Sequence, residues 1–309
     1  MMPKPRVPLF MGAKRLPGVR RVTAVIGYTC DSGIVLCADT QETIPGYTKT
    51  DANKLLPFEC HGLNLVFAGA GNNATQVDEA AYEVAAQVIA DEPRNNIELK
   101  RSVREALEEL FPKSHYPRGK DPEVDLLMAV QWKTETFLFR IADCNMAPVR
   151  KMAALGSGVI LAAQLLQRHY DRKVQVSEAA IICIYVMYHV KKFVDGCGGN
   201  TDIAIISRAT GTMAFMPSVD VEKFEKYSNA YDDAVKGLLL AVPRSPKNLG
   251  LFDQEIEAAK NGLRMARTAF QEMEDTMREV AAHLGMNYEE FVRQSEEGAE
   301  AMLKAAGIK

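Results

Sequence analysis

The sequence lacks the patterns that bind metals, nucleic acids or membrane surfaces. Its cysteines form no CxxC pair and have no His-rich region near them, and only one tryptophan is present. Cysteines scattered among apolar neighbours indicate reduced residues in the core of a cytosolic protein, neither a metal site nor a disulfide framework. A net charge of −3 gives no reason to expect binding to nucleic acid or to an anionic membrane. We therefore expect a cytoplasmic protein that needs no metal and no cofactor.

The sequence also lacks a segment long and apolar enough to span a bilayer. Its longest apolar run, 179–190, is well short of the roughly 20 residues that a spanning helix needs, and it predicts a buried helix. Residues 1–22 are basic, carry no acidic residue and lack the apolar centre of a signal peptide. We interpret them as a propeptide that is removed between Val22 and Thr23. The alternatives are a basic tail that stays attached and, less favoured, an organellar targeting segment.

What the sequence does contain is typical of a globular enzyme. Hydrophobic residues make up 47% of the 309 residues and charged residues 25%, so the chain can bury a full core. Two β-rich runs, 23–28 and 33–38, flank a Cys-Asp-Ser-Gly turn and predict a hairpin. The second run ends at Asp39, and Lys54 follows.

The three polar residues of this stretch suit the activation of a poor nucleophile. Thr23 begins one strand, Asp39 ends the next, and Lys54 comes further on, so the three can converge at one end of a sheet. A threonine hydroxyl needs a base within hydrogen-bond reach. We predict that Lys54, held by Asp39, activates Thr23. The alternative is a hairpin with an Asp and a Lys on its surface.

A glycine-rich turn provides a second candidate feature. The run 63–68 predicts a strand, and Gly-Ala-Gly-Asn-Asn follows before a helix that ends at Glu92. Asn72 or Asn73 can cap that helix. A strand, a glycine turn and a helix N-terminus together suit the binding of a developing oxyanion. The alternative is a turn with a purely structural role.

The run from Thr23 to Asp39 resembles the amino-terminal part of proteasome β-type subunits and their bacterial relatives, which are N-terminal-nucleophile hydrolases. Asp31, Gly33 and Asp39 fall on the family's positions without a gap, and Lys54 falls near the family's lysine after a segment about one residue shorter. In that family the chain is cut just before the threonine. The freed α-amine, whose pKa is roughly 7.7–8.0 in model peptides, then serves as the base.

The resemblance continues in three later segments and implies further site residues. The segment 70–76 is similar to the family's, which implies that the N–H of Gly71, or alternatively that of Gly69, binds the oxyanion. Ser157, in a Gly-Ser-Gly before a helix, matches a serine that supports the amine; the alternative is a helix N-cap.

The last matching segment surrounds Asp195. With the glycines at 198–199, Asp195 matches an aspartate that helps to hold the nucleophile. The serine that follows it in the family is absent, and the loop offers Cys197 there. Cys197 without a nearby histidine is not favoured as an independent nucleophile.

The resemblance covers 23–217 and implies an α+β fold, a four-layer αββα sandwich. Two helices, 159–170 and 177–194, precede the Asp195 segment. We expect residues 218–309 to form a C-terminal helical extension. Apolar residues repeat at heptad spacing from Ile256 to Leu284, which predicts a long helix ending at Gly285, and a shorter helix is expected over 288–306. The long helix would pair with a partner subunit or pack on its own domain.

The favoured function is a threonine-type N-terminal-nucleophile peptidase. The resemblance implies peptide or unfolded-protein substrates, assembly into a homo- or hetero-oligomeric ring, and an ATP-dependent unfoldase as a partner. A second hypothesis is a non-catalytic β-type subunit, since Val22 stands where the family usually has glycine and the serine after Asp195 is missing. A third is an amidohydrolase acting on a small molecule.

Overall fold

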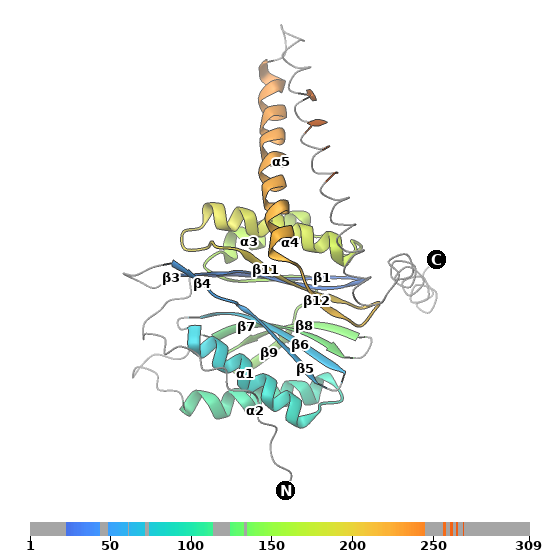
Figure 1. Ribbon diagram of the computed structural model, residues 1–309. Helices are drawn as coiled ribbons and strands as arrows, with labels where there is room; N and C mark the ends of the chain where they lie inside the picture. The colour runs from blue at the N-terminus through green and yellow to red at the C-terminus, as the bar shows by residue number, and fades with distance from the viewer. Residues whose placement is uncertain are drawn as a thin grey trace.

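The computed structural model describes residues 23–43, 49–60, 62–71, 74–113, 124–132 and 135–244, together with 256, 257, 260, 261, 264 and 268. Two five-stranded antiparallel sheets stack face to face, and helices cover both outer faces (Figure 1). This is the predicted four-layer αββα sandwich, so the fold prediction is confirmed.

The first sheet contains the predicted hairpin at its centre. Its strand order is β10-β1-β2-β11-β12, and β1 pairs with β2 through the register Val25↔Ala38 to Cys30↔Gly33. Helices α3 and α4 cover its outer face, and α5 packs on α4. The bounds are β1 Ala24–Cys30, β2 Gly33–Asp39, β10 Met152–Gly156, α3 Val159–His169, α4 Val176–Phe193, β11 Thr201–Ser207, β12 Met213–Phe215 and α5 Ser218–Arg244.

The second sheet has the sequential strand order β5-β6-β7-β8-β9 and is covered by α1 and α2. A separate two-stranded sheet, β3-β4, lies between β2 and β5 in the chain. The bounds are β3 Gln41–Thr43, β4 Lys49–Asp51, β5 Leu55–Cys60, β6 Leu63–Gly71, α1 Ala74–Asp91, α2 Asn96–Lys113, β7 Val124–Trp132, β8 Glu135–Ala142 and β9 Asn145–Pro148.

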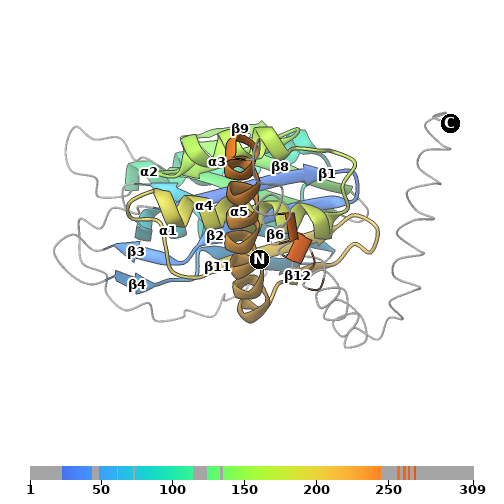
Figure 2. The ribbon, with the colours of Figure 1, turned by 90° about the horizontal axis from the view of Figure 1, so that it is seen from above.

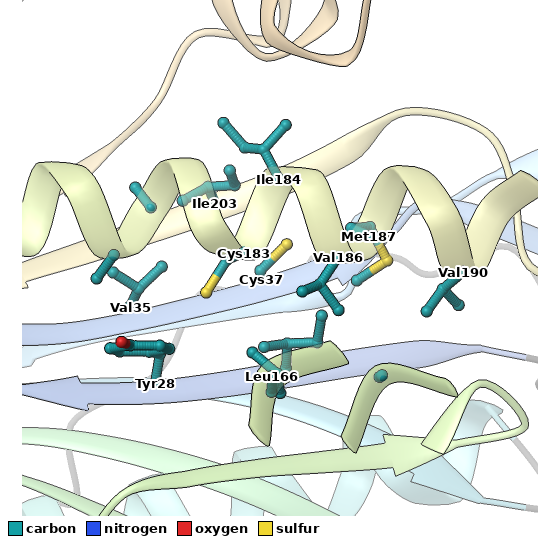
Figure 3. Packing of buried hydrophobic residues seen from close by; sticks show 14 of the residues in the cluster. Tyr28, Val35, Cys37, Leu166, Cys183, Ile184, Val186, Met187, Val190 and Ile203 are labelled. Carbon is teal, nitrogen blue, oxygen red and sulfur yellow. The ribbon is translucent and has the colours of Figure 1, made fainter. Parts of the chain in front are cut away.

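The alternation of side chains along the strands divides the core into three apolar layers. On β2, Leu36 faces the second sheet, whereas Val35 and Cys37 face the helices. In Figure 3, the side chains of Cys37 on β2 and Cys183 on α4 lie next to each other. Cys30, Cys37, Cys183 and Cys197 are buried as predicted, whereas Cys144 is only half-buried.

Helix α5 is the main feature among the described residues beyond 217. It projects away from the sandwich past α3 and α4 (Figure 1), and seen from above it crosses α4 (Figure 2). The predicted propeptide at 1–22 and the predicted helix at 288–306 lie outside the described residues, as does most of the predicted helix at 256–284. Among the described helices, none has the length and apolar character needed to cross a membrane.

Candidate active site

Thr23 lies immediately before β1, and its hydroxyl is the centre of a buried polar cluster. Thr23 Oγ1 donates to Asp39 Oδ1 at 2.8 Å and accepts a hydrogen bond from Lys54 Nζ, also at 2.8 Å. The hairpin brings Thr23 beside the end of β2, where Asp39 lies. The structure therefore brings together the three residues that the sequence predicted to converge.

Asp39 accepts hydrogen bonds at both of its carboxylate oxygens. Oδ1 accepts from the backbone N–H of Ala24 at 2.9 Å and from Lys54 Nζ at 2.8 Å, in addition to Thr23. Oδ2 accepts from the backbone N–H of Gly198 at 3.0 Å. These contacts fix the carboxylate between the start of β1 and the loop before β11.

Lys54 enters the cluster from the segment between β4 and β5. Its three ammonium hydrogens have acceptors in Thr23 Oγ1, Asp39 Oδ1 and the backbone carbonyl of Gln41, the last at 2.7 Å. The exposed fractions are 0% for Thr23, 0% for Asp39 and 1% for Lys54. An ion pair this deeply buried persists only where the partners' remaining groups are also hydrogen-bonded, as they are here.

Ser157 supports Thr23 from the turn between β10 and α3. Its hydroxyl donates to the Thr23 carbonyl oxygen at 3.2 Å. The N-cap of α3 is Gly158 and makes no side-chain cap bond, so the alternative interpretation of Ser157 as the helix cap is wrong. Gly156 allows this turn: its φ is +86°, and an added Cβ would lie 2.1 Å from the Thr23 carbonyl oxygen.

Neither Asp195 nor Gly71 makes a hydrogen bond with Thr23 in the described part of the chain. Asp195 is exposed in the turn after α4 and makes no hydrogen bond or ion pair within the described part of the chain. Gly71 ends β6 opposite Val124 on β7. Gly69 has a packing reason to be glycine, since an added Cβ would lie 2.3 Å from Val77 Cγ1 on α1. The roles assigned to Asp195 and Gly71 stay predictions.

The site includes residues that the sequence analysis did not assign to it. Gln41 clamps the loop before β11, because its side-chain amide donates to the Gly196 carbonyl and its backbone N–H donates to the Gly198 carbonyl. Cys197 Sγ lies 3.4 Å from Ser157 Oγ. The missing serine drew attention to Cys197, whereas nothing in the sequence around Gln41 indicated its role.

The charges of the cluster affect titratable neighbours. Burial raises the pKa of Asp202, on β11 opposite Ala38; the Lys54 charge opposes this effect, and the carboxylates of Asp51 and Asp39 add to it. Burial likewise raises the pKa of the Cys197 thiol. The Cys197 thiol therefore keeps its proton at neutral pH. Among the described residues, no group of histidine, cysteine and carboxylate side chains could hold a metal ion.

The two stacked antiparallel sheets with helices on both outer faces form the proteasome-like fold of the N-terminal-nucleophile hydrolases. Residues 19–206 match the model of the family described as "Proteasome subunit". The chain belongs to the proteasome subunit family.

Individual relatives are distant in sequence. The chain is 23% identical to the "Proteasome subunit alpha" of Methanococcus vannielii over 218 residues, which cover 71% of this chain and 82% of that protein. Among solved structures, the Anbu (Gly-1) mutant from Hyphomicrobium sp. strain MC1 is similar at 20% identity with a TM-score of 0.62. The match covers 72% of this chain and 99% of that one. Anbu from Yersinia bercovieri, described as an ancestral beta-subunit, is similar at 19% identity with a TM-score of 0.57, covering 73% and 98%.

Proposed function

We propose that this chain is a threonine-type N-terminal-nucleophile peptidase that hydrolyses peptide bonds. The observation that carries the proposal is the placement of Thr23 Oγ1 at 2.8 Å from both Lys54 Nζ and Asp39 Oδ1. A buried threonine hydroxyl that meets an ammonium and a carboxylate at hydrogen-bond distance has the surroundings that an activated nucleophile needs. Membership in the proteasome subunit family supports the same activity.

The mechanism requires cleavage of the Val22–Thr23 bond. In the intact chain the Thr23 nitrogen belongs to a peptide bond and cannot accept a proton. Once freed, the α-amine takes the proton of Thr23 Oγ1, and the oxygen attacks the substrate carbonyl to form an ester. The amine then gives the proton to the leaving amine, and water hydrolyses the ester with the same amine as base.

The other residues act around this step. Lys54 donates to Thr23 Oγ1 and stabilises the negative charge that develops there, while Asp39 keeps the ammonium in place. Ser157 holds the Thr23 backbone. We assign Gly71 to the oxyanion and Asp195 to the freed amine.

The proposal also assigns a role to each segment of the chain and a ring assembly to the protein. Residues 1–22 act as the propeptide, residues 23–217 as the hydrolase domain and residues 218–309 as a helical extension. We infer a homo- or hetero-oligomeric ring in the cytoplasm that encloses the sites and receives unfolded protein from an ATP-dependent unfoldase.

A second candidate is a non-catalytic structural subunit. The specific observation in its favour is the similarity to a protein named as an alpha subunit of the proteasome, together with Val22 before Thr23. Against it, an assembly role gives no reason to bury Lys54 and Asp39 against a threonine hydroxyl, since burying an ion pair costs free energy.

Hydrolysis of an unstructured peptide by four purified proteins separates the two candidates. The wild type and Thr23→Ser, which keeps a hydroxyl, should release product, whereas Thr23→Ala should not. Thr29→Ala is the matched control, because Thr29 lies on β1 but its hydroxyl contacts the Lys151 carbonyl. Equal hydrolysis by the wild type and Thr23→Ala would exclude Thr23 as the nucleophile; no hydrolysis by any of them would favour the structural subunit.

A further inference from the structure

The Cys197 thiol lies at the edge of the candidate active site, and the mechanism above gives it no part. The Cys197 side chain is 5% exposed. Its sulfur is 3.4 Å from Ser157 Oγ, and Ser157 Oγ in turn donates to the Thr23 carbonyl oxygen. A short polar chain therefore runs from a buried thiol to the backbone of the nucleophile.

The direction of the Cys197–Ser157 contact follows from the number of hydrogens. A serine hydroxyl has a single proton, and a carbonyl oxygen can only accept. The proton of Ser157 therefore lies on its bond to Thr23, and Ser157 Oγ must accept from Cys197. Burial raises the pKa of the Cys197 thiol, so the thiol has a proton to donate at neutral pH.

The backbone on both sides of Cys197 is anchored, which fixes the position of its sulfur. The Gly198 N–H donates to Asp39 Oδ2, and the Gly196 carbonyl accepts from the Gln41 amide. The sulfur also packs against the head of α3, where a Cβ added to Gly158 would lie 3.6 Å from it.

Ser157 needs such a partner because it is exposed at the turn before α3. An exposed hydroxyl rotates readily and exchanges protein partners for water. A thiol that donates to the Ser157 oxygen occupies one of its lone pairs and leaves the hydroxyl proton directed at the Thr23 carbonyl.

We propose that Cys197 is a positioning residue: its S–H group donates to Ser157 Oγ and thereby holds the Ser157 hydroxyl on the Thr23 backbone. The hydrogen bond itself stands on the geometry alone, whereas its effect on hydrolysis rests on the proposed peptidase function.

The effect on hydrolysis is tested with a matched pair of variants, Cys197→Ala and Cys197→Ser. Loss of one hydrogen bond predicts a fall in kcat of about three- to tenfold for Cys197→Ala. KM should not change, because the thiol acts through Ser157 and not on the substrate. Cys197→Ser restores a donor and should recover most of the loss. Cys183→Ala, which removes a fully buried thiol on α4, should keep the wild-type kcat. A kcat for Cys197→Ala equal to that of the wild type, or no recovery in Cys197→Ser, would overturn the positioning role.

The hydrogen bond is tested separately by infrared spectroscopy. Subtracting the spectrum of Cys197→Ala from that of the wild type isolates the Cys197 S–H stretching band, and the same subtraction is made in a Ser157→Ala background. Donation to Ser157 predicts a lower frequency in the wild type than in the Ser157→Ala background. Equal frequencies would overturn the proposal. Should the wild type show no Thr23-dependent hydrolysis, the proposed function fails, and this band still decides whether the thiol holds Ser157.

Discussion

Lys54 carries a positive charge that folding removes from water, and Asp39 carries the negative charge beside it. The Nζ–Oδ1 distance is 2.8 Å, and the side chains of both residues, taken without their backbone atoms, are 0% exposed. Desolvation of two such ions costs several kcal/mol, and their attraction offsets that cost only while both are present. Either residue alone would leave an unpaired buried charge.

We therefore expect Lys54→Met to lower the free energy of unfolding by about 3–5 kcal/mol, measured by denaturant titration, and to abolish hydrolysis. Lys100→Met, on the exposed side of α2, serves as the control and should change stability by less than about 0.5 kcal/mol. The double variant Asp39→Asn/Lys54→Met should be more stable than Lys54→Met alone. Equal stabilities for Lys54→Met and Lys100→Met would contradict the buried ion pair.

At the scale of single residues, the local sequence was sufficient to predict that Thr23 and Asp39 meet, because a tight hairpin joins their strands. The contacts of the loop before β11 could not be predicted in this way. Gln41 and Gly196 are 155 positions apart, and Asp39 and Gly198 are 159 apart. No periodicity or turn motif encodes a pairing over such a separation.

At the scale of elements, the turn between β10 and α3 links the sandwich to the site. Gly156 in this turn has a positive φ and lies against the Thr23 carbonyl, whereas Gly62 has a φ of +81° with nothing within 4 Å of an added Cβ. The two glycines therefore share the same backbone requirement and differ in their contact with the site.

Gly156→Ala should lower both stability and kcat, because the new Cβ displaces Thr23 in addition to straining the backbone. Gly62→Ala should show only the strain, about 1–2 kcal/mol, and should leave kcat unchanged. Thermal unfolding and hydrolysis rates of the two variants measure the difference. Equal kcat values for Gly156→Ala and Gly62→Ala would show that the turn does not position Thr23.

The junction of α3 and α4 predicts a dependence of stability on pH. His169, whose ring centroid lies 5.4 Å from that of Tyr185, has a pKa lowered from 6.5 by burial, with Arg168 and His189 adding to the effect. A histidine whose pKa is lower in the folded state contributes stability above its unfolded pKa, and this contribution is lost as the pH falls through 6.5 and below. The Tm of the wild type should therefore fall between pH 7.5 and 5.5, and His169→Gln should reduce that fall. Parallel Tm curves for the two proteins would contradict this assignment.

Most elements of the sandwich could be predicted from strand and helix periodicity. The helical character of α5 was also expected, as part of the extension at 218–309, but its bounds were not. Val221 and Phe224 near the start of α5 are buried, whereas Tyr231 and Val235 further along it are exposed, where the helix projects beyond the sandwich (Figure 1). An apolar stripe at helical spacing indicates a helix, but it does not show how far along the helix the packing extends.

At the scale of the whole molecule, the proposed ring predicts a particle much larger than one chain. Light scattering coupled to gel filtration should give a mass several times the chain mass of 34.1 kDa. Thr23→Ala should assemble in the same way if the propeptide does not block the contacts. A single species at the monomer mass would contradict the ring and favour the small-molecule amidohydrolase.

The proposed mechanism requires a free amine at Thr23, and intact-mass spectrometry tests for that amine most directly. The wild type should lose the mass of residues 1–22, whereas Thr23→Ala, which lacks the hydroxyl needed for self-cleavage, should retain them. A hydrolytically active wild type that carries its first 22 residues intact would contradict the mechanism.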